Sequence, residues 1–322
     1  MKTRGHRRTP ALTELGLGAA QLGNLHREID DDVSHATVDA AWNAGIRYFD
    51  TAPHYGLGLS ERRLGEALRS RPRNEFVVST KVGRLLVEDA DGQQRPDDDG
   101  FIVTSRLRRR WDFTRDGILR SVEGSLQRLG MDRLDIVYLH DPDAHWEEAS
   151  TNGIDTLVEL REQGMISAIG AGMNQSAMLA EFVRRCDVDV MMVAGRYTLL
   201  DQSAGRDLLP IARERGVAVV AAAIYNSGLL STPRPRADAR FDYAGATNDI
   251  IAKANLIADV CEQFGTTLPE AAIAYPLRES AVVSVVVGAR GAGQIGSTLQ
   301  RYDGQPPRDL WEELLERRLI EC

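Results

Sequence analysis

Four polar residues of different chemical types stand where apolar segments of the chain end. Asp50, Lys81 and His140 each close an apolar run, and Tyr55 lies in the turn that follows Asp50. A carboxylate, an ammonium, an imidazole and a phenol in one place can exchange a proton with a substrate oxygen and hold that oxygen by hydrogen bonds. Core packing does not account for the set, because buried charge is costly unless it is paired.

Each of these residues also has a structural explanation when it is taken alone. An aspartate such as Asp50 commonly caps a turn, and a histidine such as His140 commonly makes a structural hydrogen bond at the rim of a sheet. A lysine that ends an apolar strand, as Lys81 does, is as readily functional as structural. Their joint occurrence on successive segments is what favours a catalytic set.

The segments that position these residues alternate between strand and helix patterns. Short apolar runs, typical of strands buried on both faces, are separated by stretches with helical periodicity and helix caps. The expected strands are Leu15–Gly18, Ile46–Asp50, Phe76–Lys81, Asp135–His140, Ile166–Gly170, Val190–Ala194, Val217–Ile224 and Val282–Val287. Helices are expected over Asp31–Ala44, from Thr114 to Gly130, and from Leu268-Pro269 onward.

Eight strand–helix pairs predict an α/β fold, a (β/α)8 TIM barrel in a single domain over residues 1–322. The alternative is a doubly wound open sheet. It needs an early glycine-rich phosphate turn, and Gly16-Leu17-Gly18 lacks the third glycine and an immediate helix. Two long segments, Gly83–Asp112 and Ser231–Thr247, follow strands and are expected to be lids or binding loops on the catalytic face. Within the first, Arg106–Arg110 is expected to form a solvated loop face.

Composition excludes several classes of partner. The chain has 322 residues and a formal net charge of −8, which argues against nucleic-acid binding. No run of apolar residues is long enough for a membrane span, and the basic segment Met1–Pro10 is not followed by the apolar part of a secretion signal. We therefore expect a cytoplasmic protein that acts on a small molecule. Oligomeric state is left open, and no metal site is expected.

Several blocks of sequence resemble the signature blocks of the aldo-keto reductase superfamily. They are Phe49–Gly56, Ser60–Gly65, Ser79–Lys81 and Tyr138–His140. Three more blocks resemble the aldose 1-dehydrogenase branch, which includes L-fucose, D-threo-aldose and L-galactose dehydrogenases and pyridoxal 4-dehydrogenase. They are Ile169–Asn174, Gly195–Gln202 and Asn226–Leu230.

The resemblance implies roles for the four polar residues. Tyr55 would exchange the proton of the substrate oxygen, and His140 would orient that oxygen. Lys81, held by Asp50, would favour the phenolate of Tyr55 and lower its pKa by roughly two to three units. In this branch the reaction is oxidation of a sugar hemiacetal at C1 to a lactone. The reverse direction would reduce an aldehyde or ketone.

The resemblance also implies a nicotinamide dinucleotide, NAD or NADP, bound across the barrel mouth. The positions implicated are Asn174, Tyr225, Ser227, Gly228, Gly288, Arg290 and Gln294. Asn174 would bind the carboxamide, while Met173 and Ala194 replace a Ser and a Gln that are common in the family. Many members that prefer NADP carry Lys-Ser where this chain has Gly288-Ala289, and an arginine where it has Gln294. This difference favours NAD.

Other functions remain open at this point. The aldose 1-dehydrogenase branch includes pyridoxal 4-dehydrogenase, and the superfamily includes NADPH-dependent aldehyde and ketone reductases, so both activities are alternatives. Some proteins of this fold bind cofactor as regulatory subunits, although the four polar residues argue against that role here. A metal-dependent hydrolase would need histidine and carboxylate pairs at ligand spacing, which His54 and His140 do not provide.

Overall fold

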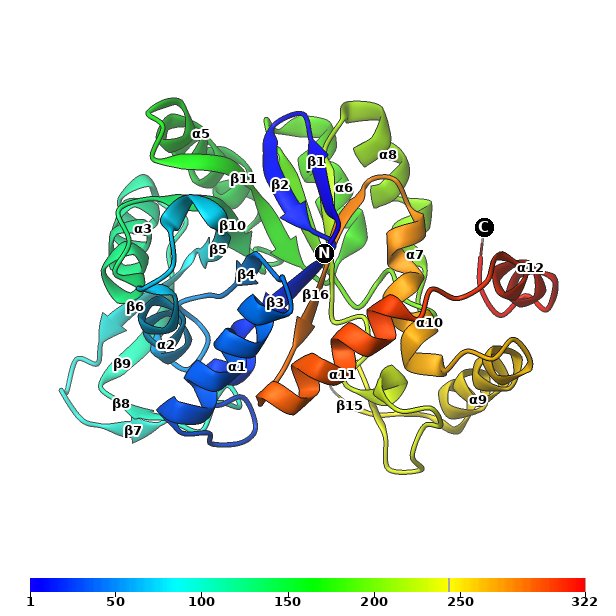
Figure 1. The fold of residues 1–322 in the computed structure, drawn as a ribbon. Coiled ribbons are helices and arrows are strands. Elements are labelled where there is room, and N and C mark those ends of the chain that lie inside the picture. The colour runs from blue at the N-terminus through cyan, green and yellow to red at the C-terminus, as the bar shows by residue number, and fades with distance from the viewer. Residues whose placement is uncertain (243, 322) are drawn as a thin grey trace.

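The computed structural model describes residues 1–242 and 244–321. Within them, eight parallel strands close into a barrel in the order of the sequence, and helices cover its outside (Figure 1). The barrel strands are β3 (Leu15–Gly18), β4 (Tyr48–Asp50), β5 (Val77–Val82), β10 (Leu134–His140), β11 (Ile166–Met173), β12 (Val190–Ala194), β13 (Ala218–Ala222) and β16 (Val282–Gly288). The closed parallel barrel confirms the expected (β/α)8 fold.

Helices connect successive strands, and local signals explain where they begin and end. The longer ones are α1 (Asp31–Asn43), α2 (Leu59–Leu68), α3 (Arg115–Leu129), α5 (Ile154–Glu162), α6 (Ser176–Arg185), α8 (Leu208–Arg215), α9 (Asn248–Gln263), α10 (Leu268–Ala274), α11 (Ala292–Asp303) and α12 (Arg308–Glu316). Thr114 caps α3 by accepting a hydrogen bond from the Gly117 amide at 3.2 Å, and Gly130 ends it with a φ of +64°. No helix in the described part of the chain has the length and apolarity to cross a bilayer.

Short elements complete the connections. They are α4 (Trp146–Glu148), α7 (Ser203–Arg206), the 3-10 turns η1 (Ala19–Gly23), η2 (Arg73–Glu75), η4 (Leu229–Ser231) and η5 (Pro276–Arg278), and the π-helical turn η3 (Ala149–Gly153).

Strand β13 ends earlier than the expected Val217–Ile224, because Ala223 turns to a φ of +53° and leaves the extended conformation. That early end creates the turn that contains Asn226 and Ser227.

The barrel has an inner core and an outer core. Along β10, Ile136 and Tyr138 join the inner cluster, whereas Val137 and Leu139 join the cluster between strands and helices. This alternation follows from the two-residue period of a strand.

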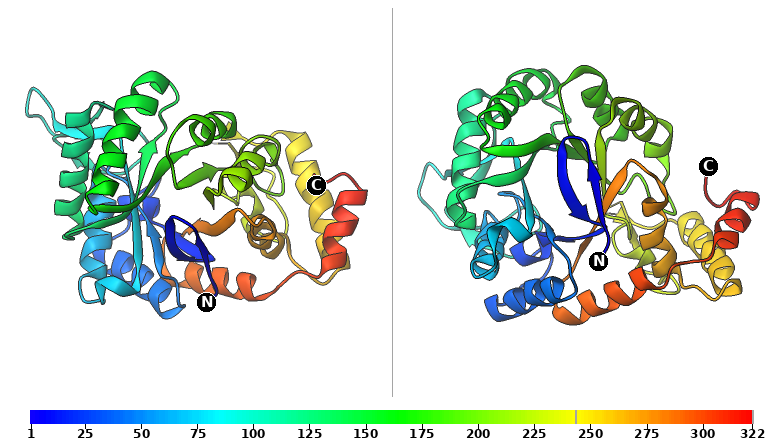
Figure 2. Two further views of the ribbon diagram at one scale, coloured as in Figure 1. Left: turned by 90° about the horizontal axis from the view of Figure 1, so that it is seen from above. Right: turned by 45° about the horizontal axis from the view of Figure 1, so that its top comes forward.

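An N-terminal hairpin of β1 (Thr3–His6) and β2 (Thr9–Thr13) lies across one end of the barrel (Figure 2). The sequence did not predict this hairpin.

The two long segments are partly ordered into hairpins at the opposite end. Residues 83–112 contain β6 (Arg84–Glu88) paired with β9 (Leu107–Trp111), and β7 (Arg95–Pro96) paired with β8 (Thr104–Ser105). Residues 231–247 contain β14 (Arg240–Phe241) paired with β15 (Ala244–Gly245). The expectation that Arg106–Arg110 is a loop was wrong, although Arg106 and Arg110 are exposed as a solvated face requires. Four of its five residues lie in β9, and the Arg109 side chain is only 11% exposed because it pairs with Asp97.

Candidate active site

Asp50 and Lys81 form an ion pair inside the barrel. The Lys81 ammonium nitrogen lies 2.7 and 2.9 Å from the two carboxylate oxygens of Asp50, and 2.9 Å from the Thr51 carbonyl oxygen. Asp50 ends β4 and Lys81 lies near the end of the neighbouring strand β5, so adjacent strands deliver the pair. Burial alone would lower the pKa of Lys81, but Asp50 and Tyr55 together raise it above its ordinary value. Lys81 is therefore charged at neutral pH.

Tyr55 lies beside this pair, on the turn after β4. The Lys81 ammonium nitrogen is 4.8 Å from the centre of the Tyr55 ring. Burial raises the pKa of Tyr55 to about 12, and the Lys81 charge offsets only part of that rise because Asp50 opposes it. The expected fall in the pKa of Tyr55 was therefore wrong for the protein alone. That expectation counted the lysine charge but neither the burial of the phenol nor the carboxylate paired with the lysine.

Close backbone packing fixes the turn that carries Tyr55. A Cβ atom at Gly23, the last residue of η1, would lie 2.7 Å from the carbonyl carbon and oxygen of Tyr55. Gly56 has a φ of +64°, and a Cβ atom there would lie 2.3 Å from the Gly23 carbonyl oxygen. Both positions therefore require glycine. The contact holds Tyr55 in place relative to strand β3, which precedes η1.

His140 ends β10 and faces Tyr55. The ring centres of the two residues are 5.8 Å apart, with an angle of 89° between the ring planes. Burial, followed by the charge of Lys81, holds the pKa of His140 well below its usual value. The imidazole is therefore neutral at pH 7 and carries one N–H donor. Its Nδ1 atom is buried and has no hydrogen-bond partner among the described residues.

A chain of buried hydroxyls continues from Asp50 into the barrel. The Ser79 hydroxyl donates to Oδ1 of Asp50 at 2.7 Å and lies 2.9 Å from the Tyr48 hydroxyl, which lies 3.3 Å from that of Tyr138. All three hydroxyl-bearing side chains are fully buried. Sequence reasoning missed this chain. The available signal was the presence of tyrosines at inward-facing positions of otherwise apolar strands.

Arg84, Asp141 and His54 form a second polar group, which we call the Arg84 group. Arg84 donates to Oδ2 of Asp141 at 2.5 Å, and its Nη1 atom lies 3.4 Å from Nδ1 of His54. The same Oδ2 of Asp141 lies 3.6 Å from Nε2 of His140. Burial, together with the Arg84 charge, lowers the pKa of His54 to about 2, so His54 is neutral. The sequence analysis gave this group no role, although Arg84 and Asp141 lie within three residues of predicted site residues.

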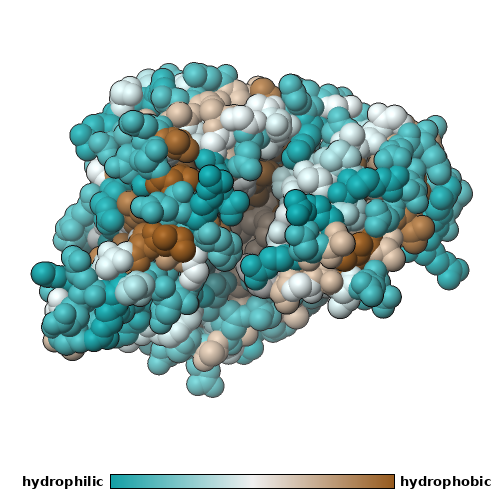
Figure 3. Space-filling view, turned by 90° about the horizontal axis from the view of Figure 1, so that it is seen from below, coloured by the Kyte–Doolittle hydropathy of each residue, from teal (hydrophilic) through white to brown (hydrophobic). Residues whose placement is uncertain are grey.

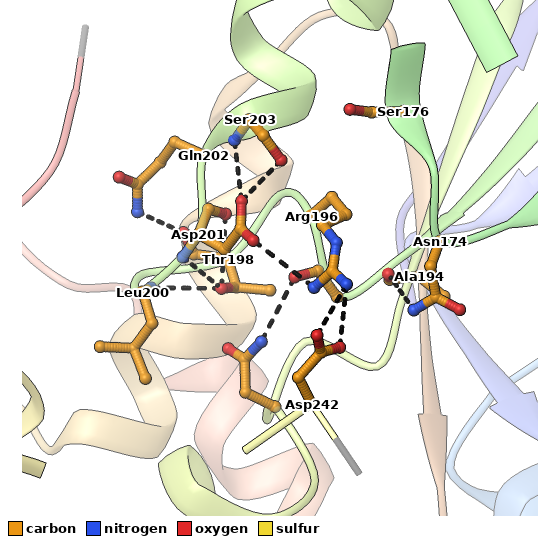
Figure 4. Close-up of polar contacts among 12 residues, drawn as sticks. Asn174, Ser176, Ala194, Arg196, Thr198, Leu200, Asp201, Gln202, Ser203 and Asp242 are labelled. Carbon is orange, nitrogen blue, oxygen red and sulfur yellow. Dashed lines mark hydrogen bonds and ion pairs between the residues drawn. The ribbon is translucent and has the colours of Figure 1, made fainter. Parts of the chain in front are cut away.

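The ends of β11, β12 and β13 carry two asparagine amides. Asn174, predicted to bind the cofactor, donates from Nδ2 to the carbonyl oxygen of Ala194 at 2.9 Å (Figure 4). Asn226 donates to the carbonyl oxygen of Gly195 at 3.3 Å. Its Oδ1 atom is buried and lacks a hydrogen-bond partner within the part of the chain that the structure describes. An unsatisfied amide acceptor at this rim fits the hydrogen-bonding groups of a carboxamide.

Three more of the predicted cofactor residues, Tyr225, Ser227 and Gly228, lie in the turn after β13. Asn226, Ser227 and Gly228 have successive φ values of +45°, +58° and +95°. The turn is closed by its own backbone: the Asn226 amide donates to the Ala223 carbonyl oxygen at 2.9 Å, and the Gly228 amide donates to that of Tyr225 at 3.0 Å. Tyr225, just before them, is half-buried, and its hydroxyl accepts a hydrogen bond from Arg301 of α11 at 3.3 Å.

The remaining three predicted cofactor residues lie where β16 leads into α11. The side chain of Gln294 accepts a hydrogen bond from the Arg290 amide at 2.7 Å. The Arg290 guanidinium is half-buried and donates to the Leu25 carbonyl oxygen at 3.5 Å, and its Nε atom is buried without a partner among the described residues. At Gly288 a Cβ atom would lie 2.4 Å from the side chain of Gln21. This segment thus brings a partly buried cation to the start of a helix, where anions are favoured.

Most of these groups lie at the carboxyl ends of the barrel strands, the end that also carries the β6–β9 hairpin and β15. Seen from that side, the surface is hollowed near its centre, with apolar residues inside and mostly polar residues around the rim (Figure 3). Active sites of TIM barrels lie at this end. The structure brings Asp50, Tyr55, Lys81 and His140 together.

Comparison with known proteins agrees with this arrangement. The model of the aldo/keto reductase family matches residues 14–314. The chain is 46% identical to D-threo-aldose 1-dehydrogenase of Pseudomonas sp., covering 96% of this chain and 95% of that protein. It is 37% identical to pyridoxal 4-dehydrogenase of Microbacterium luteolum, with the same coverage of 96% and 95%. Among solved structures, an aldo-keto reductase from Bacillus halodurans superposes with a TM-score of 0.76 at 25% identity, over 100% of this chain and 97% of the other.

The match to the family model covers most of the chain, and the two relatives reported are oxidoreductases by name. The family uses nicotinamide dinucleotides, NAD or NADP. This protein belongs to the aldo/keto reductase family and is an oxidoreductase of its aldose dehydrogenase branch.

Proposed function

We propose that this protein oxidises an aldose at C1, converting the cyclic hemiacetal to a lactone. The observation that carries the proposal is the position of Tyr55 and His140 beside the buried Asp50–Lys81 pair, in a chain 46% identical to a D-threo-aldose 1-dehydrogenase. In the reaction the C1 hydroxyl loses its proton and C1 loses hydride, which leaves a C1 carbonyl. When bound, the nicotinamide dinucleotide supplies the acceptor for that hydride.

In this proposal Tyr55 takes the proton from the C1 hydroxyl. A phenolate is needed for that step, and the positive charge of Lys81 stabilises it. Asp50 keeps Lys81 charged and directs it, through contacts of 2.7 and 2.9 Å. Neutral His140 donates one hydrogen bond to the reacting oxygen. In the opposite direction the protonated Tyr55, whose pKa is about 12, is ready to donate its proton to a carbonyl oxygen.

The residues at the rim fit a nicotinamide dinucleotide, and we propose that they hold it. Asn174 and the unpartnered Oδ1 atom of Asn226 match the donors and acceptors of a carboxamide. Ser227, Gly228 and Gly288 border the same rim, and the half-buried guanidinium of Arg290, near the start of α11, offers a positive charge to a phosphate. Tyr225 borders this region. Because Gln294 is uncharged and caps the Arg290 amide, we propose NAD rather than NADP as the cofactor.

The test is the absorbance change at 340 nm with purified protein, NAD or NADP, and a panel of L-fucose, L-galactose, D-arabinose and pyridoxal. We expect cofactor reduction with at least one of the sugars, and faster reduction of NAD than of NADP. The 37% identity to pyridoxal 4-dehydrogenase makes pyridoxal the second candidate substrate. Turnover of pyridoxal alone would favour that activity. No oxidation of any of the four, with reduction of simple aldehydes by NADPH, would contradict the proposal.

A further inference from the structure

We propose that Arg84 and Asp141 form a subsite for the sugar hydroxyl next to the reacting carbon, and so select a neutral, hydroxyl-rich substrate. The inference rests on the proposed function, since it assigns the part of the same site that recognises the substrate. It adds residues that the four-residue set does not contain.

The positions of Asp141 and Arg84 next to His140 support this assignment. Asp141 follows His140 in the chain, and its Oδ2 atom lies 3.6 Å from Nε2 of His140 and 2.5 Å from Arg84. If His140 holds the oxygen on C1, the carboxylate lies within reach of the oxygen on the next carbon. Neighbouring oxygens of a sugar are separated by about the length of one hydrogen bond. A C2 hydroxyl could therefore donate to Asp141 and accept from Arg84.

The balance of charges around the Arg84 group also supports this assignment. The Arg84 group offers a donor and an acceptor side by side, and its ion pair has no net charge. The charges of the neighbouring cations are also balanced by carboxylates, since Arg109 pairs with Asp97 and Lys81 pairs with Asp50. A substrate carboxylate or phosphate would have to compete with those carboxylates. A hydroxyl both donates and accepts, so it can bind to the pair without separating its charges.

Unused bonding capacity and backbone strain point to the same residues. The Nε atom of Arg84 is buried and has no hydrogen-bond partner within the described residues. Asp141 has a φ of +43°, which is uncommon for a residue with a side chain. Buried donors without partners and strained residues both concentrate at binding sites. The side chains of Arg84 and Asp141 are 18% and 31% exposed, so a small molecule can reach them.

Trp111 supports the guanidinium and borders the subsite. It pairs with Arg84 across the β6–β9 hairpin, and the Arg84 guanidinium carbon lies 4.5 Å from the centre of the indole. Trp111 is nevertheless 43% exposed. A cation held over an aromatic ring keeps its position. An exposed aromatic surface beside paired polar groups is also suited to a sugar, which has C–H groups on one face and hydroxyls at its edge.

The experiment compares each aldose with its 2-deoxy counterpart, D-arabinose with 2-deoxy-D-ribose and L-fucose with 2-deoxy-L-fucose. The readout is the ratio of the two kcat/KM values, measured in wild type, Arg84→Met and Asp141→Asn. Arg108→Met is the matched control, because Arg108 lies in the same hairpin but pairs with Asp89. A thermal melt of each variant checks that it is folded. A ratio is insensitive to a general loss of activity, so partial destabilisation does not mimic the effect.

We expect wild type to prefer the complete sugar by about 10- to 100-fold, the value of a hydrogen bond to a charged group. In Arg84→Met and Asp141→Asn this preference should fall at least about threefold, because each variant removes one of the two charged partners of the hydroxyl, while Arg108→Met keeps it. Variants that retain the wild-type ratio would overturn the inference even if their rates are low. If wild type oxidises no aldose at all, the proposed function fails first. That outcome is visible before any variant is made, and the inference fails with it.

Discussion

The ammonium nitrogen of Lys81 lies 2.7 Å from a carboxylate oxygen of Asp50, and the two side chains are only 3% and 4% exposed. Each charge of this pair is therefore compensated by the other rather than by water. Burial is the main reason why Tyr55 stays protonated in the protein alone, and the pairing of Lys81 with Asp50 contributes to it. A lysine whose charge is balanced by a carboxylate exerts a weaker pull on a neighbouring phenol than an unpaired lysine would.

Replacing Lys81 by methionine should lower the free energy of unfolding by about 3–5 kcal/mol, because it leaves the Asp50 carboxylate buried without its partner. Urea denaturation measures this loss. Lys253→Met is a matched control, since Lys253 donates to the Leu200 carbonyl oxygen at 3.2 Å instead of a carboxylate. The control should lose about 1 kcal/mol. Equal losses of unfolding free energy in the two variants would mean that breaking the buried ion pair costs no more than losing one ordinary hydrogen bond.

Ser79→Ala should destabilise the protein by about 1.5–3 kcal/mol, because it removes a 2.7 Å hydrogen bond to a buried carboxylate. It should also lower kcat, since Asp50 loses the donor that fixes one of its oxygens. Ser34→Ala is the comparison: Ser34 is fully buried too, but its hydroxyl has no partner among the described residues. That substitution should be nearly neutral in stability and activity. The prediction fails if both serine variants behave alike.

Acid should destabilise the protein through His54 and His140. The pKa of His54 is lowered to about 2 and that of His140 well below its usual value, mainly by burial. Above about pH 6.5 both residues are neutral in the folded and unfolded states. As pH falls below this value the unfolded chain takes up protons that the folded protein does not, so the free energy of unfolding falls. The fall approaches about 1.4 kcal/mol per pH unit for each histidine.

Urea denaturation between pH 7.5 and pH 5 tests this expectation, with His54→Gln as the variant. Glutamine does not titrate, so the variant should lose less stability on acidification than wild type loses. Parallel stability curves for the two proteins would show that His54 takes up its proton equally in both states.

The rate of oxidation should rise with pH, whereas the rate of reduction should not. With a pKa of about 12, Tyr55 is protonated near neutrality, and its phenolate fraction grows by up to about tenfold per pH unit. Between pH 7 and 9 we expect kcat/KM for aldose oxidation to increase and kcat/KM for aldehyde reduction to stay level. Initial rates at fixed ionic strength measure both. Oxidation that slows as pH rises would argue against Tyr55 as the proton acceptor.

The barrel and the rim of the site could be predicted because their signals are local. Apolar runs with helix caps between them predict parallel strands, and parallel strands place residues such as Asp50 and His140 at one end. The residues at which the strands end were predicted less accurately. Strand β13 is shorter than expected because Ala223 adopts a positive φ, which no apolar pattern reveals.

What could not be predicted depends on contacts between distant residues. The three successive arginines Arg108–Arg110 favour a loop in the sequence, but they lie in a strand, and Arg109 is half-buried and paired with Asp97. The Ser79–Asp50 contact and the Arg84–Asp141 pair likewise join residues far apart in the chain. The pKa of Tyr55 was mispredicted for a related reason. It depends on burial, which is a property of the whole fold.

The central claim is that Tyr55 transfers the proton at the reacting oxygen. Its most direct test is the initial rate of NADH or NADPH formation at 340 nm by wild type and Tyr55→Phe, with the best aldose of the panel. Fluorescence titration of cofactor binding shows whether the variant keeps its fold and cofactor site. We expect kcat to fall by about 10²- to 10⁴-fold while the cofactor Kd changes little. A Tyr55→Phe protein that oxidises the sugar within a few-fold of the wild-type rate would contradict the account.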